Sequence, residues 1–358
     1  MMLSSRFYLY LFFISSMMGG SVVVSKVLLQ YRYRGSMASL ITAIILVICL
    51  MLMFYRVQKK FPGQNLAEIM GRTYPGWFKN LFLLYQQLLL YATGSLVLVG
   101  TTKVAITFIA PEMHTFHFLF LVSLLIVGTA MLESVPLLKM MEIAAVITIP
   151  IYILFTARVL TDETMLSDSI IEATTYITVF PNFNAVTAAT FVFMSCTNML
   201  VFFRHIEFIP IKHISVAALI GVANLLACYF VPIGYLGLNG AAEEVFVWQG
   251  VLDSMRFNYL PVERMTSVFL LVQLGMSLLF VILCWHSSLQ YHDMTKGGGK
   301  VKWLFVSFFV ASTFIIEYYT DETGLVNWFV GLFSIRLFSE LFLLLVLMQA
   351  AAIQKRRS

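Results

Sequence analysis

Residues 7–29, FYLYLFFISSMMGGSVVVSKVLL, form the first apolar span of the chain, and Met18-Gly19-Gly20-Ser21 interrupt it near its midpoint. Each glycine weakens a helix by about 1 kcal/mol relative to alanine. A helix break also frees backbone groups that hydrocarbon cannot satisfy, so it survives in a membrane only where it is buried in protein or lines a cavity. The interruption therefore predicts a place where a small molecule binds.

The composition predicts an integral membrane protein. Apolar residues make up 60% of the 358 residues and charged residues only 11%, whereas about a quarter of an average soluble domain is charged. Stretches long enough to cross about 30 Å of hydrocarbon occur about ten times. We expect a single all-α polytopic domain, residues 1–358, with spans near 7–29, 37–55, 78–109, 116–132, 137–158, 185–203, 213–237, 264–288, 302–319 and 325–349.

Basic residues predict the orientation, because Lys and Arg stay on the cytoplasmic side of short loops. With the N-terminus inside, Lys59, Lys139 and Lys300 fall in cytoplasmic loops, and Glu172 and Asp321 fall outside. We therefore expect a multi-pass protein with both termini in the cytoplasm, although Arg32 and Arg34 run against the rule. The net charge of +5 reflects this anchoring in the lipid bilayer, and no nucleic-acid patch is expected.

Motifs of enzymes and of cofactor sites are missing from the sequence. It has no phosphate-binding glycine loop with its lysine, no HExxH and no GxSxG elbow. Its four cysteines are widely spaced within apolar spans, and its histidines lack partnering Cys/His sets, so we expect no catalysis, metal or cofactor. The histidines are expected at the surface or at interfaces.

A second weak point lies in the sixth span, at Ser195-Cys196-Thr197-Asn198. Small polar residues compete for backbone hydrogen bonds, so this stretch could unwind in the membrane. Broken first and sixth helices are typical of a five-plus-five inverted repeat, here 1–160 and 180–358, with amides free for a carboxylate and carbonyls free for a cation. The alternative is that the glycines only permit close helix packing and that Ser195 and Thr197 bond to their own helix.

One segment resembles a known family. Phe61-Pro62-Gly63-Gln64-Asn65-Leu66-Ala67-Glu68-Ile69 is similar to the FPGxxLxEI signature of the membrane-embedded B subunits of spore germinant receptors (GerAB-like), which resemble permeases of the amino acid, polyamine and organocation superfamily. Residues 260–265, LPVERM, are similar to a second family segment before the eighth span. Locally, Pro62 and Gly63 stop the second span and Asn65 caps a short amphipathic helix. The motif therefore also suits a loop that only holds two helices in register.

The resemblance implies a subunit in the inner membrane of a dormant spore that works with germinant receptor A and C subunits. It implies a nutrient pocket, for an amino acid in many relatives, built by the first, third, sixth and eighth spans. The matching ligand-binding candidates are Gly19, Gly20, Ser21, Tyr91, Gly94, Ser95, Cys196, Thr197, Asn198, Gln273 and Ser277. Many members of the family carry an acidic residue near the sixth-span break, and residues 193–198 have none, which favours a neutral amino acid or a ligand with fewer charges.

Three functions remain open from the sequence. The first is a nutrient sensor, the second is a secondary amino-acid transporter coupled to Na⁺ or H⁺, and the third is a scaffold that binds no ligand. Charged residues inside spans favour none of them strongly. We expect Arg336 and Glu340 to pair along one helix face, and Lys103 and Glu142 to extend to the membrane surface.

Overall fold

The computed structural model describes residues 2–19, 23–161, 165–194, 196–254, 265–295 and 299–357. Gly20, Ser21, Ser195 and residues 260–264 of the second motif lie outside this description. Within the described ranges the regular elements are helices, joined by one isolated backbone bridge between Leu3 and Ile206. The helices are α1 Phe7–Gly19, α2 Ser25–Gln30, α3 Ser36–Lys60, α4 Leu66–Thr73, α5 Gly76–Phe108, α6 Thr115–Ala130, α7 Ser134–Leu160, α8 Ser167–Thr175, η2 Tyr176–Thr178, α9 Phe183–Phe191, α10 Cys196–Phe202, α11 Ile211–Glu243, α12 Val247–Ser254, α13 Met265–Asp293, α14 Gly299–Tyr319 and α15 Glu322–Arg357.

Seven helices of the described residues are long and apolar enough to cross a membrane, namely α3, α5, α7, α11, α13, α14 and α15. Two shorter apolar helices, α1 and α6, accompany them. The chain is therefore an all-α, multi-pass membrane protein, as its composition predicts. The first and sixth expected spans each coincide with two short helices, α1 with α2 and α9 with α10.

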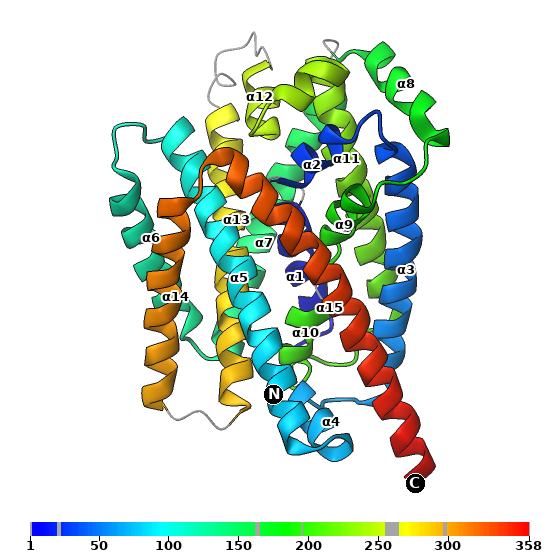
Figure 1. The fold of residues 1–358 in the computed structure, drawn as a ribbon, viewed down its shortest axis with the longest axis vertical. Coiled ribbons are helices and arrows are strands. Elements are labelled where there is room, and N and C mark those ends of the chain that lie inside the picture. The colour runs from blue at the N-terminus through cyan, green and yellow to red at the C-terminus, as the bar shows by residue number, and fades with distance from the viewer. Residues whose placement is uncertain are drawn as a thin grey trace.

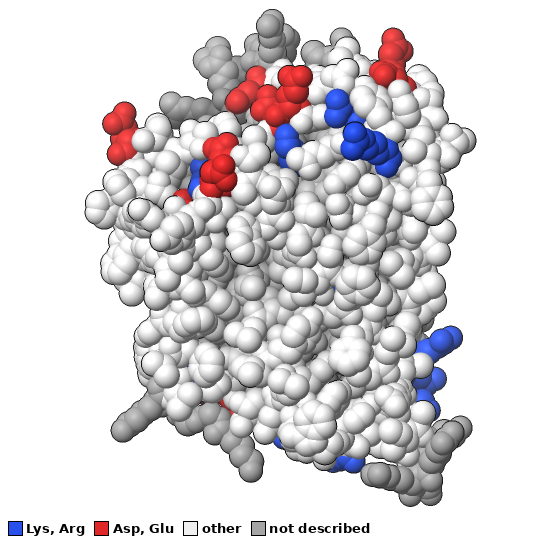
Figure 2. Space-filling view, in the orientation of Figure 1, with Lys and Arg blue, Asp and Glu red and all other residues white. Residues whose placement is uncertain are grey.

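Charged residues lie at the two ends of the molecule. On the face shown in Figure 2, Asp and Glu gather at the end where α2, α8 and α12 lie, Lys and Arg occur at both ends, and the surface between is almost uncharged. Both chain ends lie at the opposite end from α12 (Figure 1). An uncharged belt between two charged ends is the surface that a bilayer requires.

The short helices α1, α9 and α10 lie among the long helices (Figure 1). Helix α1 lies against α7, α11 and α13, whereas α9 lies against α3 and α15. Helices α5 and α13 pack against each other, and Gly94 of α5 lies at their contact. A Cβ atom at Gly94 would lie 2.6 Å from Cδ1 of Trp285, so only glycine allows this approach.

The FPG segment forms the turn between α3 and α4. Gly63 adopts a φ of 66°, in the left-handed region that glycine favours. Asn65 caps α4 as expected. Its side-chain oxygen accepts from the backbone N–H of Glu68 at 2.9 Å, and the Glu68 carboxylate accepts from the backbone N–H of Asn65 at 3.0 Å. Glu68 also pairs with Arg204, which follows α10, so the motif contacts the sixth-span segment as well as its own helices.

Lys103, near the C-terminal end of α5, pairs through its Nζ with Glu317 of α14 at 3.2 Å. One expectation about polar side chains is wrong. Histidines do not all lie at the surface, since His286 and His292 of α13 are buried. The carbonyl of Ala130 lies 2.9 Å from Nδ1 of His286 and can only accept, so Nδ1 carries the proton and Nε2 accepts from Ser134 at 3.0 Å.

Candidate functional site

The sixth span loses regular helical bonding just before Ser195. Helix α9 ends at Phe191, and the amides of Phe193 and Met194 bond to carbonyls three residues back, at 3.0 and 3.1 Å. Helix α10 then begins at Cys196. Carbonyl groups near the end of α9 are thereby released from α-helical bonds and need partners from elsewhere in the protein.

The two short-helix pairs meet in the middle of the bundle. The ring of Phe12 in α1 lies 6.4 Å from the ring of Phe193, which follows α9. Gly221 of α11 makes room for both, because a Cβ there would lie 2.4 Å from Phe193 and 3.1 Å from Phe12. Farther along, the Asn184 amide of α9 donates to the hydroxyl of Tyr31 beside α2 at 2.8 Å. The first and sixth spans are therefore direct neighbours.

Each of these segments has a carbonyl bound by a polar side chain from a neighbouring helix. The amide of Asn224 in α11 donates to the Ser16 carbonyl of α1 at 2.7 Å and lies 3.2 Å from the Ser16 hydroxyl. The guanidinium of Arg336 in α15 lies 3.4 Å from the Met194 carbonyl and 3.7 Å from Glu340. Both Arg336 and Glu340 are buried. Long helices thus support the backbone of both short-helix pairs.

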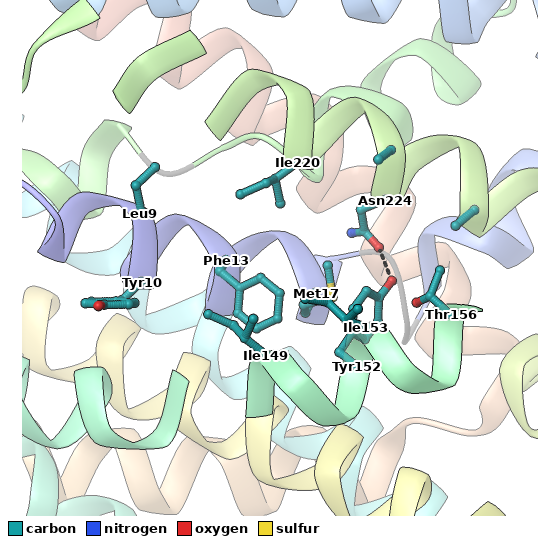
Figure 3. A pocket seen from close by; sticks show the side chains of 12 residues that line it. Leu9, Tyr10, Phe13, Met17, Ile149, Tyr152, Ile153, Thr156, Ile220 and Asn224 are labelled. Atoms are coloured by element: carbon teal, nitrogen blue, oxygen red, sulfur yellow. Dashed lines mark hydrogen bonds between the residues drawn. The ribbon is translucent and has the colours of Figure 1, made fainter. Parts of the chain in front are cut away.

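A cavity of about 370 Å³ lies beside α1 (Figure 3). Side chains of α1, α7 and α11 line it, most of them apolar, such as Phe13 and Ile149. Its polar end lies beside Met17, near the end of α1, where the Tyr152 hydroxyl donates to Asn224 at 3.1 Å (Figure 3). The volume falls in the range of small-molecule sites.

A second and much smaller cavity, of about 10 Å³, lies next to the end of α9. Glu340 lines it together with Thr190, Phe193 and Met194. About one water molecule would fill this volume. Glu340 of α15 therefore places a carboxylate beside the end of α9.

Four of the predicted site residues fall on the described parts of the short helices. Gly19 ends α1, and Cys196 and Thr197 begin α10. Asn198 is buried, and its amide nitrogen lies 3.9 Å from the sulfur of Cys284 in α13. This contact links the sixth span to α13, the helix of the eighth predicted span.

The predicted residues of α5 and α13 have other described partners. Tyr91 stacks on Phe309 of α14, with ring centroids 4.0 Å apart, and its hydroxyl contacts Ser312. Ser95 accepts from Thr313 of α14 at 2.9 Å, and Gly94 contacts Trp285 as described above.

Gln273 and Ser277 share a buried face of α13, as their spacing predicts. The Ser277 hydroxyl donates to the Gln273 carbonyl at 3.0 Å.

Two buried polar residues beside the short helices were not singled out by the sequence. Asn224 is one, and Lys26 of α2 is the other: its ammonium donates to the carbonyls of Ala242 and Glu243 at 2.8 and 3.3 Å, at the end of α11. A lone amide and a lone lysine within apolar spans are the signal that could have found them, because such groups are costly in a membrane without partners.

No protein-family model matches the chain, and no curated protein matches it.

Proposed function

We propose that this chain is the membrane subunit of a spore nutrient germinant receptor. It senses a small nutrient such as an amino acid in a permease-like pocket and triggers germination together with receptor A and C subunits. It resides in the inner membrane of the spore with both termini in the cytoplasm. The FPG segment supports the family, and the alternation of basic and acidic loops supports the orientation.

The observation that carries the proposal is the contact between the first and sixth spans at Phe12 and Phe193, with carbonyls of both segments bound by side chains of long helices. Such short helices at the centre of a bundle are typical of ligand sites in transporter-like folds. We further propose ten spans in a five-plus-five inverted repeat. The positions of the helix pairs α1–α2 and α9–α10, first and sixth among the apolar segments, support it.

Sensing requires that a ligand bind two conformations with different affinity, without transport being necessary. A change at α10 would reach the FPG segment through Arg204 and Glu68. Helix α4 in turn contacts α15, where the Tyr74 hydroxyl donates to the Val346 carbonyl at 3.1 Å. Through these contacts, a conformational change of α10 would reach the end of the molecule where both termini lie (Figure 1).

The test is Gly20→Leu, expressed in spores of a host that depends on this gene for nutrient germination. We expect loss of the nutrient response, read as the fall in optical density, with normal protein level in the membrane. Gly128→Leu is the control, since nothing lies within 4 Å of a Cβ at Gly128. Equal loss of protein would instead indicate a packing role for Gly20, and an unchanged response would favour the scaffold.

The alternative is a secondary amino-acid transporter coupled to Na⁺ or H⁺, for which the same central helices would serve. Reconstitution of the purified chain into liposomes with labelled amino acids separates the two functions. Concentrative uptake driven by an ion gradient would replace the sensor with the transporter.

A further inference from the structure

The side chain of Arg336 in α15 carries hydrogen-bond donors that the protein does not use. The guanidinium is fully buried, and its Nη2 donates to the Met194 carbonyl at 3.4 Å. Its Nε and Nη1 have no hydrogen-bond partner within the part of the chain that the structure describes. Unused donors on a buried charged group are costly in a membrane interior. The guanidinium is therefore equipped to bind a further acceptor, and an anionic acceptor best.

An unused acceptor lies in the same region, on α10. Asn198 is buried, and its Oδ1 has no hydrogen-bond partner among the described residues. Its amide nitrogen lies 3.9 Å from Sγ of Cys284 in α13, and the same Cys284 lies close enough to Arg336 to feel its charge. Helix α10 contacts both α13 and α15. The unused donors and the unused acceptor thus belong to one buried cluster, which these three helices form.

Glu340 makes the net charge of this cluster zero. Its Oε1 lies 3.7 Å from Nη2 of Arg336, which is beyond hydrogen-bond distance. Glu340 also lines the small cavity beside the end of α9, and the other described residues that line this cavity are uncharged. A bound anion or cation alone would leave one charge uncompensated, which is strongly unfavourable in a membrane interior. A ligand that brings one charge of each sign keeps the cluster neutral.

The cluster is closed in the structure. The cavity of about 10 Å³ holds about one water molecule, so a larger ligand enters only if α9 and α10 move apart. Regular helical bonding is interrupted between the end of α9 at Phe191 and the start of α10 at Cys196. Such an interruption is where a chain absorbs changes in φ and ψ. Ligand entry would therefore change the conformation of the sixth span, as sensing requires.

We propose that this cluster binds the charged groups of a small zwitterionic α-amino acid. The carboxylate accepts from Nε or Nη1 of Arg336, and the ammonium donates to Oδ1 of Asn198 and to the Glu340 carboxylate. The ligand thereby replaces the long contact between Arg336 and Glu340 with two closer ion pairs. The inference rests on the proposed role as a nutrient receptor and adds the residues of α15 that recognise the nutrient.

The test measures binding of labelled ligands to the purified chain by equilibrium dialysis, in nanodiscs of phosphatidylethanolamine and phosphatidylglycerol. Glycine and the L-amino acids with uncharged side chains are screened first. The tightest binder is then compared with three relatives that share its side chain: the carboxylate without the amino group, the amine without the carboxylate, and the uncharged 2-hydroxy amide. We expect each relative to bind at least about tenfold more weakly, because each lacks a hydrogen bond between charged groups.

Variants locate the binding. Arg336→Met combined with Glu340→Leu removes both charges together, so no buried charge is left unpaired, and should weaken the amino acid at least about thirtyfold. Asn198→Leu, which removes the unused acceptor, should weaken it about tenfold. The matched control combines Lys103→Met with Glu317→Leu, which removes the ion pair between α5 and α14, and should leave the affinity unchanged. Size-exclusion profiles show whether each variant is folded, and Asn198→Leu decides if the double variant aggregates.

Three results would overturn the proposal. The first is that no amino acid of the screen binds saturably, the second is that a relative binds as tightly as the amino acid, and the third is unchanged affinity in the folded Arg336 and Glu340 double variant or in Asn198→Leu. With the third result, loss of the nutrient response in Gly20→Leu spores would still support a receptor whose site lies elsewhere. The inference and the proposed function therefore fail separately.

Discussion

The buried pair of Arg336 and Glu340 has a clear energetic consequence at the scale of single residues. Their nearest atoms are 3.7 Å apart and both side chains are buried. Removing one partner leaves an uncompensated charge in a membrane protein interior, which costs about 3 kcal/mol or more, whereas replacing both with apolar residues is much less damaging. The pair thus keeps the guanidinium beside the Met194 carbonyl, and the stability of the protein is sensitive to substitution of either residue alone.

We therefore predict that Arg336→Met and Glu340→Leu each lower the apparent Tm in detergent more than the double variant does. Fluorescence-detected size-exclusion chromatography after heating measures it. The pair of Lys103 and Glu317, which is partly exposed, serves as the comparison and should show smaller losses. Additive losses in the Arg336 and Glu340 double variant would contradict the prediction.

Replacing a helical glycine with alanine usually stabilises the helix. We predict the opposite effect at Gly94. Gly94→Ala places Cβ 2.6 Å from Trp285, which is fully buried, so we expect destabilisation of about 1–3 kcal/mol.

The matched control is Gly275→Ala in α13, where nothing lies within 4 Å of the added Cβ. It should be neutral or stabilising, because alanine favours helix. Thermal stability of the two variants gives the comparison, and equal effects would rule out a close approach of α5 and α13 at Gly94.

At the scale of elements, the start of α15 depends on Asp321, which lies outside the membrane-spanning segments. Its Oδ1 accepts from the Gly324 amide at 2.7 Å and its Oδ2 from the Thr323 hydroxyl at 3.1 Å. These hydrogen bonds favour the carboxylate and lower the pKa of Asp321. The stabilisation is therefore fully present above the ordinary pKa of about 4 and is lost as the pH falls through the lower folded-state value.

We expect Asp321→Ala to lower the thermal stability at neutral pH, and the difference from the unmodified protein to shrink as the pH falls below about 4. Thermal unfolding measured between neutral and acidic pH gives the comparison. A difference that persists unchanged at low pH would show that the carboxylate charge does not contribute.

Element by element, the sequence predicted what depends on neighbours along the chain. The Asn65 cap was predicted from adjacent residues and is confirmed, and Glu68, three residues further on, completes a capping box with it. The same Glu68 also contacts Arg204, and nothing local predicts that contact. The role of the FPG segment as a turn was therefore predictable, and its contact with the sixth-span segment was not.

At the scale of the whole molecule, the orientation proposed above makes a prediction for labelling. Phe180, in the loop before α9, is 87% exposed, and Trp77, at the start of α5, is 69% exposed. In a Cys49→Ala background, Phe180→Cys should react with a membrane-impermeant maleimide in intact cells, and Trp77→Cys only after permeabilisation. The reverse pattern would invert the topology.

The long apolar helices were predictable from the sequence, because hydropathy over a span is a property of consecutive residues. The contacts around the candidate site were harder to predict. Asn224 reaches Ser16 across 208 positions and Lys103 reaches Glu317 across 214, so both contacts depend on which helices become neighbours. His286 was misplaced for the same reason, since its partners Ser134 and Ala130 lie in another part of the chain.

The backbone bridge between Leu3 and Ile206 has a consequence for biogenesis. The Leu3 amide donates to the His205 carbonyl at 2.7 Å, and the Glu207 amide donates to the Leu3 carbonyl at 2.9 Å. Synthesis at about 5–20 residues per second separates these partners by roughly 10–40 s. During that interval the first segment must stay in the membrane or the insertion machinery without its final neighbours. We therefore expect factors that shield nascent membrane segments to matter most for this chain before its sixth span emerges.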